Sequence, residues 1–234
     1  MKLILTLCLA GAVFFLNGWA ARADDNNSST ANVFASSPVL PATIKRVLVL
    51  PLANDESSPE LVGGCQTLDS VLRAELIKTV KFEVVPASPE ILRNCTGRSS
   101  WTGEELLPPN FLTSLTNVYG CDAVLFSQLT EFRSSEPLEI GWRLKLVDAS
   151  NGKILWAADE IFDAANQDEA KAAQKYEKSR QPHQGVIYDT WAFLGWCIHT
   201  PTRSALDDQW NILHSPRYFG EYSVQKLLKT LPQR

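Results

Sequence analysis

The middle of the chain alternates apolar and polar residues with the period of a β-strand. Four apolar side chains fall on one face and two basic side chains on the other: Ile140, Trp142, Leu144 and Leu146 against Arg143 and Lys145. This period of two is typical of an antiparallel strand covered on one face. Strand-like runs flank it on both sides, and Asn151-Gly152 supplies the positive φ angles of a tight turn. The pattern predicts a β-meander between Gly120 and Asp163.

The preceding segment has the pattern of a strand, a helix and a second strand. Residues 46–52 (Arg-Val-Leu-Val-Leu-Pro-Leu) are apolar nearly throughout, as in a strand buried on both faces. Ser57 and Glu60 have capping-box spacing and Pro59 fits a first turn, so a helix is predicted to about residue 78. Its apolar stripe contains Leu61, Cys65, Leu68, Leu72 and Leu76. Glu75 lies off this stripe, and we expect it to matter little for stability.

Residues 82–85 predict the second strand, which makes a βαβ unit with parallel strands. A short helical turn is expected at 88–94. A further helix is expected from Asn110, which can cap it, to Gly120, with Phe111 or Leu112, Leu115 and Val118 as its stripe. The order is β-α-β-α-β-β-β. The predicted fold class is therefore α/β, with a mixed sheet in two or three layers and a helical carboxyl-terminal extension.

The first 41 residues differ in character from the rest. Residues 1–23 combine Lys2, an apolar run and the small-x-small ending Ala21-Arg22-Ala23, which predicts a secretory signal peptide. Residues 24–41 are rich in Asn, Ser and Ala and predict a disordered leader. Cleavage would leave 20 basic against 26 acidic side chains and move the net charge from −4 to −6. A periplasmic or secreted chain is expected, with no transmembrane segment after cleavage and no affinity for nucleic acid.

Residues 164–234 form the extension beyond the α/β domain, which spans residues 42–163. A solvated helix is predicted at 166–180 and further helices at 204–213 and 220–231. The last of these can dock on the core through Tyr222, Val224, Leu227, Leu228 and Leu231. An aromatic stretch, residues 186–198, contains Tyr188, Trp191, Phe193 and Trp196. These four side chains either cover a sheet face or form a patch that binds a partner.

Four cysteines follow the predicted cleavage site, namely Cys65, Cys95, Cys121 and Cys197. Four cysteines allow three pairings in an exported chain. Cys65 and Cys95 each follow a parallel strand and should reach one rim of the sheet, so they are the preferred disulfide. The alternative is that Cys65 is a small core residue on the apolar stripe.

Candidate chemistry is sparse. The three histidines, His183, His199 and His214, match no zinc spacing. Phosphate-loop, Gly-x-Ser-x-Gly and His-Glu-x-x-His motifs do not occur in the sequence. The one specific enzyme hypothesis pairs Cys197 with His199 or His214 as nucleophile and base. The acidic group Asp159, Glu160 and Asp163 is interpreted as a solvated edge, so no catalytic, cofactor or metal site is predicted.

Three stretches resemble a known group of bacterial envelope proteins. They are residues 46–52, residues 120–125 (Gly-Cys-Asp-Ala-Val-Leu) and the hairpin 144–156. Together they resemble the group that contains the TolB amino-terminal domain, the CsgG secretion protein and the LpoB activator of peptidoglycan synthases. This resemblance implies a non-enzymatic, protein-binding module whose partners are other envelope proteins.

Overall fold

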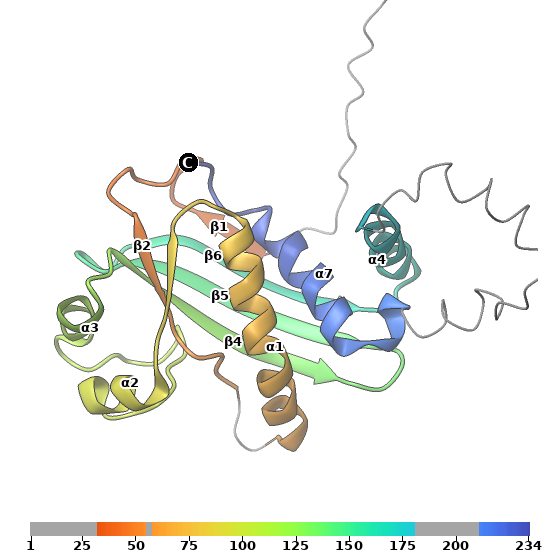
Figure 1. Ribbon diagram of the computed structural model, residues 1–234, viewed down its shortest axis with the longest axis horizontal. Helices are drawn as coiled ribbons and strands as arrows, with labels where there is room; N and C mark the ends of the chain where they lie inside the picture. Colours follow the sequence, from red (N-terminus) through yellow and green to blue (C-terminus); the bar gives the residue numbers. More distant parts are fainter. Residues whose placement is uncertain (1–31, 55–57, 181–210) are drawn as a thin grey trace, which may run out of the picture.

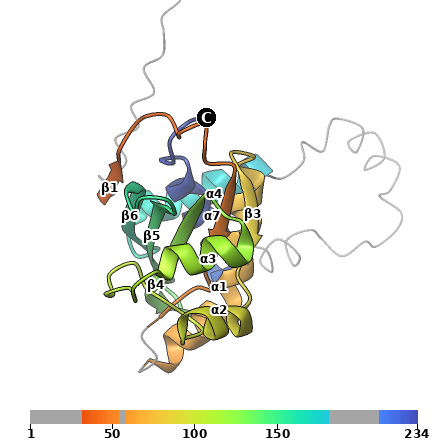
Figure 2. The same ribbon diagram turned by 90° about the vertical axis from the view of Figure 1, so that its left-hand side faces the viewer.

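A computed structural model describes residues 32–54, 58–180 and 211–234 (Figures 1 and 2). These residues contain a six-stranded sheet in the order β1-β6-β5-β4-β2-β3. The strands are β1 (Asn32–Ala35), β2 (Arg46–Val49), β3 (Glu83–Pro86), β4 (Ala123–Arg133), β5 (Glu139–Asp148) and β6 (Ile154–Asp163). β2 runs parallel to β3 and β4, and the other neighbours are antiparallel. The predicted mixed sheet is confirmed. The structure adds β1, which lies inside the segment 24–41 expected to be a disordered leader.

The helices are α1 (Pro59–Lys78), α2 (Pro89–Thr96), α3 (Phe111–Tyr119), α4 (Gln167–Arg180) and α7 (Pro216–Leu228), with a short 3-10 helix at Ile212–His214. α1 begins with Ser58 as its N-cap, whose side chain accepts a hydrogen bond from the Leu61 amide at 3.5 Å. The cap is therefore Ser58, one residue beyond the Ser57 expected from the capping-box spacing. Pro59 occupies the first turn as predicted.

Helices cover both faces of the sheet and give three layers. α1 and α7 lie side by side on one face, here called the α1/α7 face (Figure 1). Its core includes Leu68 and Leu72 of α1 and the predicted apolar row of β5, all fully buried. α2 and α3 cover part of the opposite face, the α2/α3 face, over a second core around Leu48, Phe111 and Phe126.

Close approach of α7 to α1 depends on one glycine. A Cβ atom at Gly220 would lie 2.4 Å from Leu68 Cδ2 and 3.6 Å from Ile140 Cδ1. One turn along α7, Ser223 Oγ accepts a hydrogen bond of 2.8 Å from the buried indole of Trp142. The five α7 and tail residues expected to dock on the core are buried: Tyr222, Val224, Leu227, Leu228 and Leu231. That prediction is confirmed.

Two side chains do not lie where the helical stripes placed them. Glu75 was expected off the packed face, but it is only 3 % exposed because α7 packs along that side of α1. The expectation for Glu75 is therefore wrong. Val118 was expected in the stripe of α3, but it is 52 % exposed.

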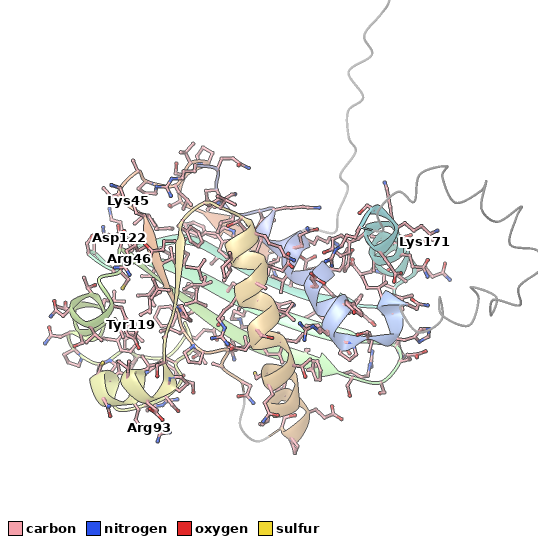
Figure 3. All side chains as sticks on the ribbon, viewed as in Figure 1. Lys45, Arg46, Arg93, Tyr119, Asp122 and Lys171 are labelled. Atoms are coloured by element: carbon pink, nitrogen blue, oxygen red, sulfur yellow. The ribbon has the colours of Figure 1, made fainter. Side chains whose placement is uncertain are left out.

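Asp122 fixes the start of β4 against the start of β2. Its Oδ2 atom accepts hydrogen bonds of 2.9 Å from the amides of both Lys45 and Arg46, and its own amide donates to the Arg46 carbonyl at 2.9 Å. Figure 3 shows these three residues together at one end of the sheet. Arg46 also pairs with Glu83 of β3 at 3.1 Å, so this end aligns three neighbouring strands.

Candidate interaction surface

The second core stops at β5. Its buried residues come from β2, β4, β5, α2, α3 and the connections between them, and among the described residues none comes from β6 or β1. The loop before α3 reaches as far as β5 through polar contacts. Lys145 Nζ donates to the Gly103 carbonyl at 2.5 Å, and Arg143 pairs with Glu104 at 3.0 Å. Beyond these contacts, the α2/α3 face of β6 and β1 has no helical cover within the described chain. Figure 2 shows β1 at the margin of the molecule, apart from α2.

Alternation along β6 decides which side chains meet this uncovered area. Alternate residues of the strand are buried in the core of the α1/α7 face, namely Trp156, Ala158 and Phe162, together with Leu155 at the irregular start of the strand. Successive strand residues point to opposite faces, so Ala157, Asp159 and Ile161 point to the α2/α3 face. Phe34 of β1 lies opposite Ala157 and shares its face. We call Phe34, Ala157, Asp159 and Ile161 the β6–β1 strip.

The strip is apolar at its ends and charged in its middle. Phe34 is 52 % exposed and Ile161 is 53 % exposed. Between them, Asp159 accepts a hydrogen bond of 2.6 Å from Arg143 Nε. This charge is therefore already paired, and a molecule that covers the strip need not supply a cation.

Among the described residues, β1 also presents a backbone edge with which no strand pairs. The Ser36 amide donates to the Leu155 carbonyl at 3.0 Å, which places the amide and carbonyl of Ser36, and by alternation those of Phe34 and Asn32, toward β6. The amides and carbonyls of Val33 and Ala35 therefore point away from the sheet. All four residues of β1 are exposed and uncharged. The opposite edge strand, β3, carries Glu83 and Pro86, residue types that discourage edge pairing.

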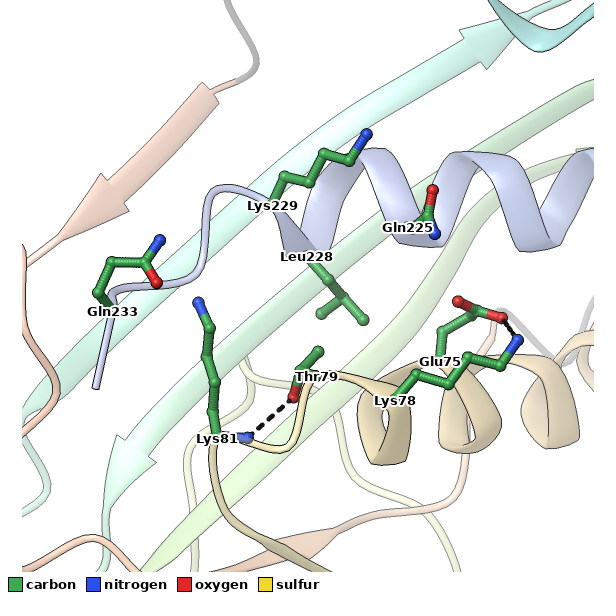
Figure 4. Close-up of a pocket in the computed structure, with 8 residues that line it drawn as sticks. All are labelled: Glu75, Lys78, Thr79, Lys81, Gln225, Leu228, Lys229 and Gln233. Atoms are coloured by element: carbon green, nitrogen blue, oxygen red, sulfur yellow. Dashed lines mark hydrogen bonds and ion pairs between the residues drawn. The ribbon is translucent and has the colours of Figure 1, made fainter. Parts of the chain in front are cut away.

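A groove lies between the end of α1 and the carboxyl-terminal tail (Figure 4). It has a volume of about 330 Å³ and three lysines among its lining residues, Lys78, Lys81 and Lys229. Lys81 Nζ donates to the carbonyls of Leu231 and Pro232 at 2.6 and 3.0 Å. Lys78 pairs with Glu75 of α1 at 2.5 Å and with Glu221 of α7 at 3.0 Å. Two of the three ammonium groups thus hold the tail and α7 in place, so we interpret the groove as structural.

That second carboxylate, Glu221, joins α7 to both α1 and α4. It pairs with Lys78 at 3.0 Å and with Arg180 at 2.5 Å. Burial alone would raise the pKa of Glu221, but hydrogen bonds from Arg180 and Lys78 outweigh it and lower that pKa to about 2. For Glu75 the balance is reversed, because burial raises its pKa and the hydrogen bond from Lys78 offsets only part of the effect.

The structure does not bring the predicted disulfide pair together. Cys65 and Cys95 are both free thiols. Cys65 belongs to α1 and packs against the core of the α1/α7 face, with its Sγ 3.7 Å from the Ala53 carbonyl. Cys95 belongs to α2 on the opposite face and donates to the Ile91 carbonyl at 2.9 Å. The prediction relied on both residues reaching one rim of the sheet, but they lie on helices that cover opposite faces.

Several other sequence-predicted site residues lie outside the described part of the chain. They are the aromatic residues Tyr188, Trp191, Phe193 and Trp196 and the pair Cys197 and His199. His214 is described and contacts the Glu136 carboxylate through Nδ1. Residues 32–54, 58–180 and 211–234 contain no group of three side chains placed to hold a metal ion. Of the acidic group on β6, Asp159 pairs with Arg143 of the neighbouring strand β5, and Asp163 pairs with Arg133 at the end of β4.

Sequence reasoning missed the β6–β1 strip. A usable signal was present in β6, where Trp156, Ala158 and Phe162 fall on one face and Ile161 falls on the other, beside Asp159. This alternation predicts an apolar side chain on the polar face at Ile161. Phe34 had no comparable signal, because Val33 and Phe34 are isolated apolar residues among Asn, Ser and Ala.

Comparison with known proteins gives structural likeness at low sequence identity. No family model matches the chain, and no curated protein matches it in sequence. Similar solved structures include the PelC dodecamer from Paraburkholderia phytofirmans, with 15 % identity and a TM-score of 0.47, covering 88 % of this chain and 98 % of that one. Lipoprotein GNA1162 from Neisseria meningitidis has 22 % identity and a TM-score of 0.42, covering 58 % and 96 %. The LpoB carboxyl-terminal domain from Salmonella enterica has 18 % identity and a TM-score of 0.34, covering 50 % and 81 %.

LpoB belongs to the envelope group that the sequence resembles, and that resemblance is confirmed. At these sequence identities the likeness concerns the fold alone. Within the described residues, no helix combines the length and apolar composition needed to cross a bilayer.

Proposed function

We propose that this chain is an exported, non-enzymatic module of the bacterial cell envelope that binds another envelope protein through the β6–β1 strip. The observation that carries the proposal is the exposure of Phe34 and Ile161, 52 % and 53 %, beside an unprotected strand edge. Exposed apolar side chains next to a free edge are typical of interaction sites. The envelope setting is supported by the signal-peptide pattern of residues 1–23 and by the resemblance to the TolB and LpoB group.

The chemistry of the strip determines what would bind there. Removing a large apolar side chain from water contributes about 1.5–3 kcal/mol, so covering the exposed halves of Phe34 and Ile161 contributes roughly 0.8–1.5 kcal/mol each. Asp159 stays paired with Arg143 and adds no unpaired charge to the interface. A partner with an apolar contact area and a polar rim fits this arrangement.

Site-specific photocrosslinking tests the proposed function. A photoreactive benzophenone amino acid replaces Phe34 or Ile161 in the full chain, which is produced in its native cells and irradiated. We expect both positions to give a covalent adduct with the same envelope protein. Val118 of α3, which is 52 % exposed, is the matched control and should not give that adduct. Absence of an adduct from both strip positions, or the same adduct from Val118, would overturn the proposal.

The aromatic residues Tyr188, Trp191, Phe193 and Trp196 are proposed as a second contact with the same partner. The support is their clustering in the sequence, since aromatic side chains dominate interface energetics. Trp191→Ala should reduce the yield of the Ile161 adduct while the melting temperature stays within about 2 °C of wild type. An unchanged yield, or unfolding of the variant, would remove this segment from the binding surface.

A further inference from the structure

We propose that the free edge of β1 binds an extended, uncharged segment of the partner, which adds to the sheet as a seventh strand. This inference rests on the proposed function and specifies how the partner is held. Its first support is the direction of the backbone groups. The amides and carbonyls of Val33 and Ala35 point away from β6, as the Ser36 to Leu155 hydrogen bond and the strand register require. Two donors and two acceptors in that pattern match an extended backbone.

The edge is open on all sides within the described residues. Each of Asn32, Val33, Phe34 and Ala35 is exposed, and no described strand lies beyond them. At the other edge of the same sheet, Glu83 and Pro86 of β3 make pairing with a further strand unfavourable. The absence of a charged residue or proline from β1 therefore distinguishes it from an edge built to repel strands.

The bound segment should be uncharged, because β1 offers no counter-charge. An added strand would place its side chains beside Val33 and Ala35 on one face and beside Phe34 on the other. A charged side chain at these places would lose hydration against apolar neighbours and gain no ion pair. On the Phe34 side, the next side chains across the sheet belong to the β6–β1 strip, so an apolar residue there extends the same contact.

The size of the edge favours a segment of another protein over a second copy of this chain. A strand of four residues is about 13 Å long. Two copies joined only through β1 would bury far less than the roughly 1,200 Å² of a stable protein interface. A segment of another protein is not restricted to this small buried area, because the rest of that protein also covers the β6–β1 strip.

Proline substitution tests the hydrogen bonds directly. Ala35→Pro removes an amide that points outward and leaves the β1–β6 ladder intact, since proline is tolerated on edge strands. Ala35→Ser is the matched control and keeps the amide. The probe is an acetylated, amidated eight-residue peptide that alternates threonine and valine, and its affinity for the full chain is measured by isothermal titration calorimetry. We expect Ala35→Pro to weaken binding at least tenfold and Ala35→Ser to change it less than twofold, with both melting temperatures equal to that of wild type.

Three results with the purified chain would overturn the inference. The first is failure of the wild-type chain to bind the peptide, and the second is equal affinity of wild type and Ala35→Pro. The third is self-association of wild type that Ala35→Pro abolishes in analytical ultracentrifugation, which would make a second copy the occupant. The Ile161 crosslink separates this inference from the proposed function. An adduct that persists in the Ala35→Pro background rejects strand addition but keeps the interaction module, whereas loss of every adduct in wild type rejects the module itself.

Discussion

The contact between Gly220 of α7 and Leu68 of α1 allows a quantitative test of the packing. Gly220→Ala places a methyl group 2.4 Å from Leu68 Cδ2, a distance at which one of the two groups must move. Leu68 is fully buried, so it has little room to do so. We expect the two positions to be strongly coupled, such that shortening Leu68 relieves the effect of the added methyl.

The expected free energies follow from three contributions. Gly220→Ala gains about 1 kcal/mol of helix propensity and loses about 1–3 kcal/mol to overpacking, so the single variant is neutral to about 2 kcal/mol less stable. Leu68→Ala alone should cost about 2–5 kcal/mol, as is usual for a buried leucine. In the double variant the overpacking disappears, and the alanine methyl fills part of the cavity. We therefore expect the double variant to be about 2 kcal/mol more stable than the sum of the single effects.

Urea denaturation of wild type, both single variants and the double variant measures this coupling. Leu72→Ala combined with Gly220→Ala is the control, because Leu72 is equally buried but is not among the three nearest contacts of the added methyl. Its coupling to Gly220 should be below about 0.5 kcal/mol. If Leu68 and Gly220 also prove additive within that limit, α7 does not pack on α1 as described.

Three further predictions concern charged and sulfur-containing groups. Glu221→Gln should lower the free energy of unfolding by about 2 kcal/mol at pH 7, after allowance for solvent screening. The pKa of Glu221 is about 2 in the folded state against an ordinary 4.5, so this contribution is complete above pH 4.5 and is lost as the pH falls toward 2. In urea titrations, the stabilities of wild type and variant should therefore converge over that pH range. Asp122→Ala removes the acceptor of two amide hydrogen bonds and should cost about 2 kcal/mol, whereas Lys171→Ala on the exposed side of α4 should leave the denaturation midpoint unchanged. Iodoacetamide at pH 8 should modify Cys95 before Cys65, because burial raises the pKa of the Cys65 thiol to about 12. Detection by non-reducing mass spectrometry of a disulfide-linked peptide that contains Cys65 and Cys95 would contradict the structure.

Local patterns in the sequence were sufficient for most of the fold. The period of two in β5 and the spacing of Leu68 and Leu72 in α1 both arise from side chains that bury one face of an element, and this requirement is visible within about ten residues. The turn residue Gly152 has the positive φ that the Asn-Gly pair predicted. These elements could be found without knowing what they pack against.

The misses share a physical origin in contacts between distant parts of the chain. Glu75 is buried by α7, and the contact between Lys78 and Glu221 spans 143 residues. The hydrophobic periodicity of one segment does not predict a contact with a residue so distant in the sequence. β1 was missed for the complementary reason that none of its residues is buried, so no face selects an apolar pattern. The Cys65–Cys95 pairing failed because the choice of sheet face for α2 depends on the whole topology.

The place of β1 in the sheet has a consequence for the order of folding. The backbone hydrogen bond that anchors β1 runs from the Ser36 amide to the Leu155 carbonyl, 119 residues apart in the sequence. Every other described strand pairs with a strand that is closer in the sequence. Closing so long a loop is entropically costly and gains few contacts, so β1 should join the sheet last and leave it first. Local opening would then release β1 without unfolding the five remaining strands. In native-state hydrogen exchange, the Phe34 amide should exchange far faster than the Leu144 amide, although both belong to the same sheet.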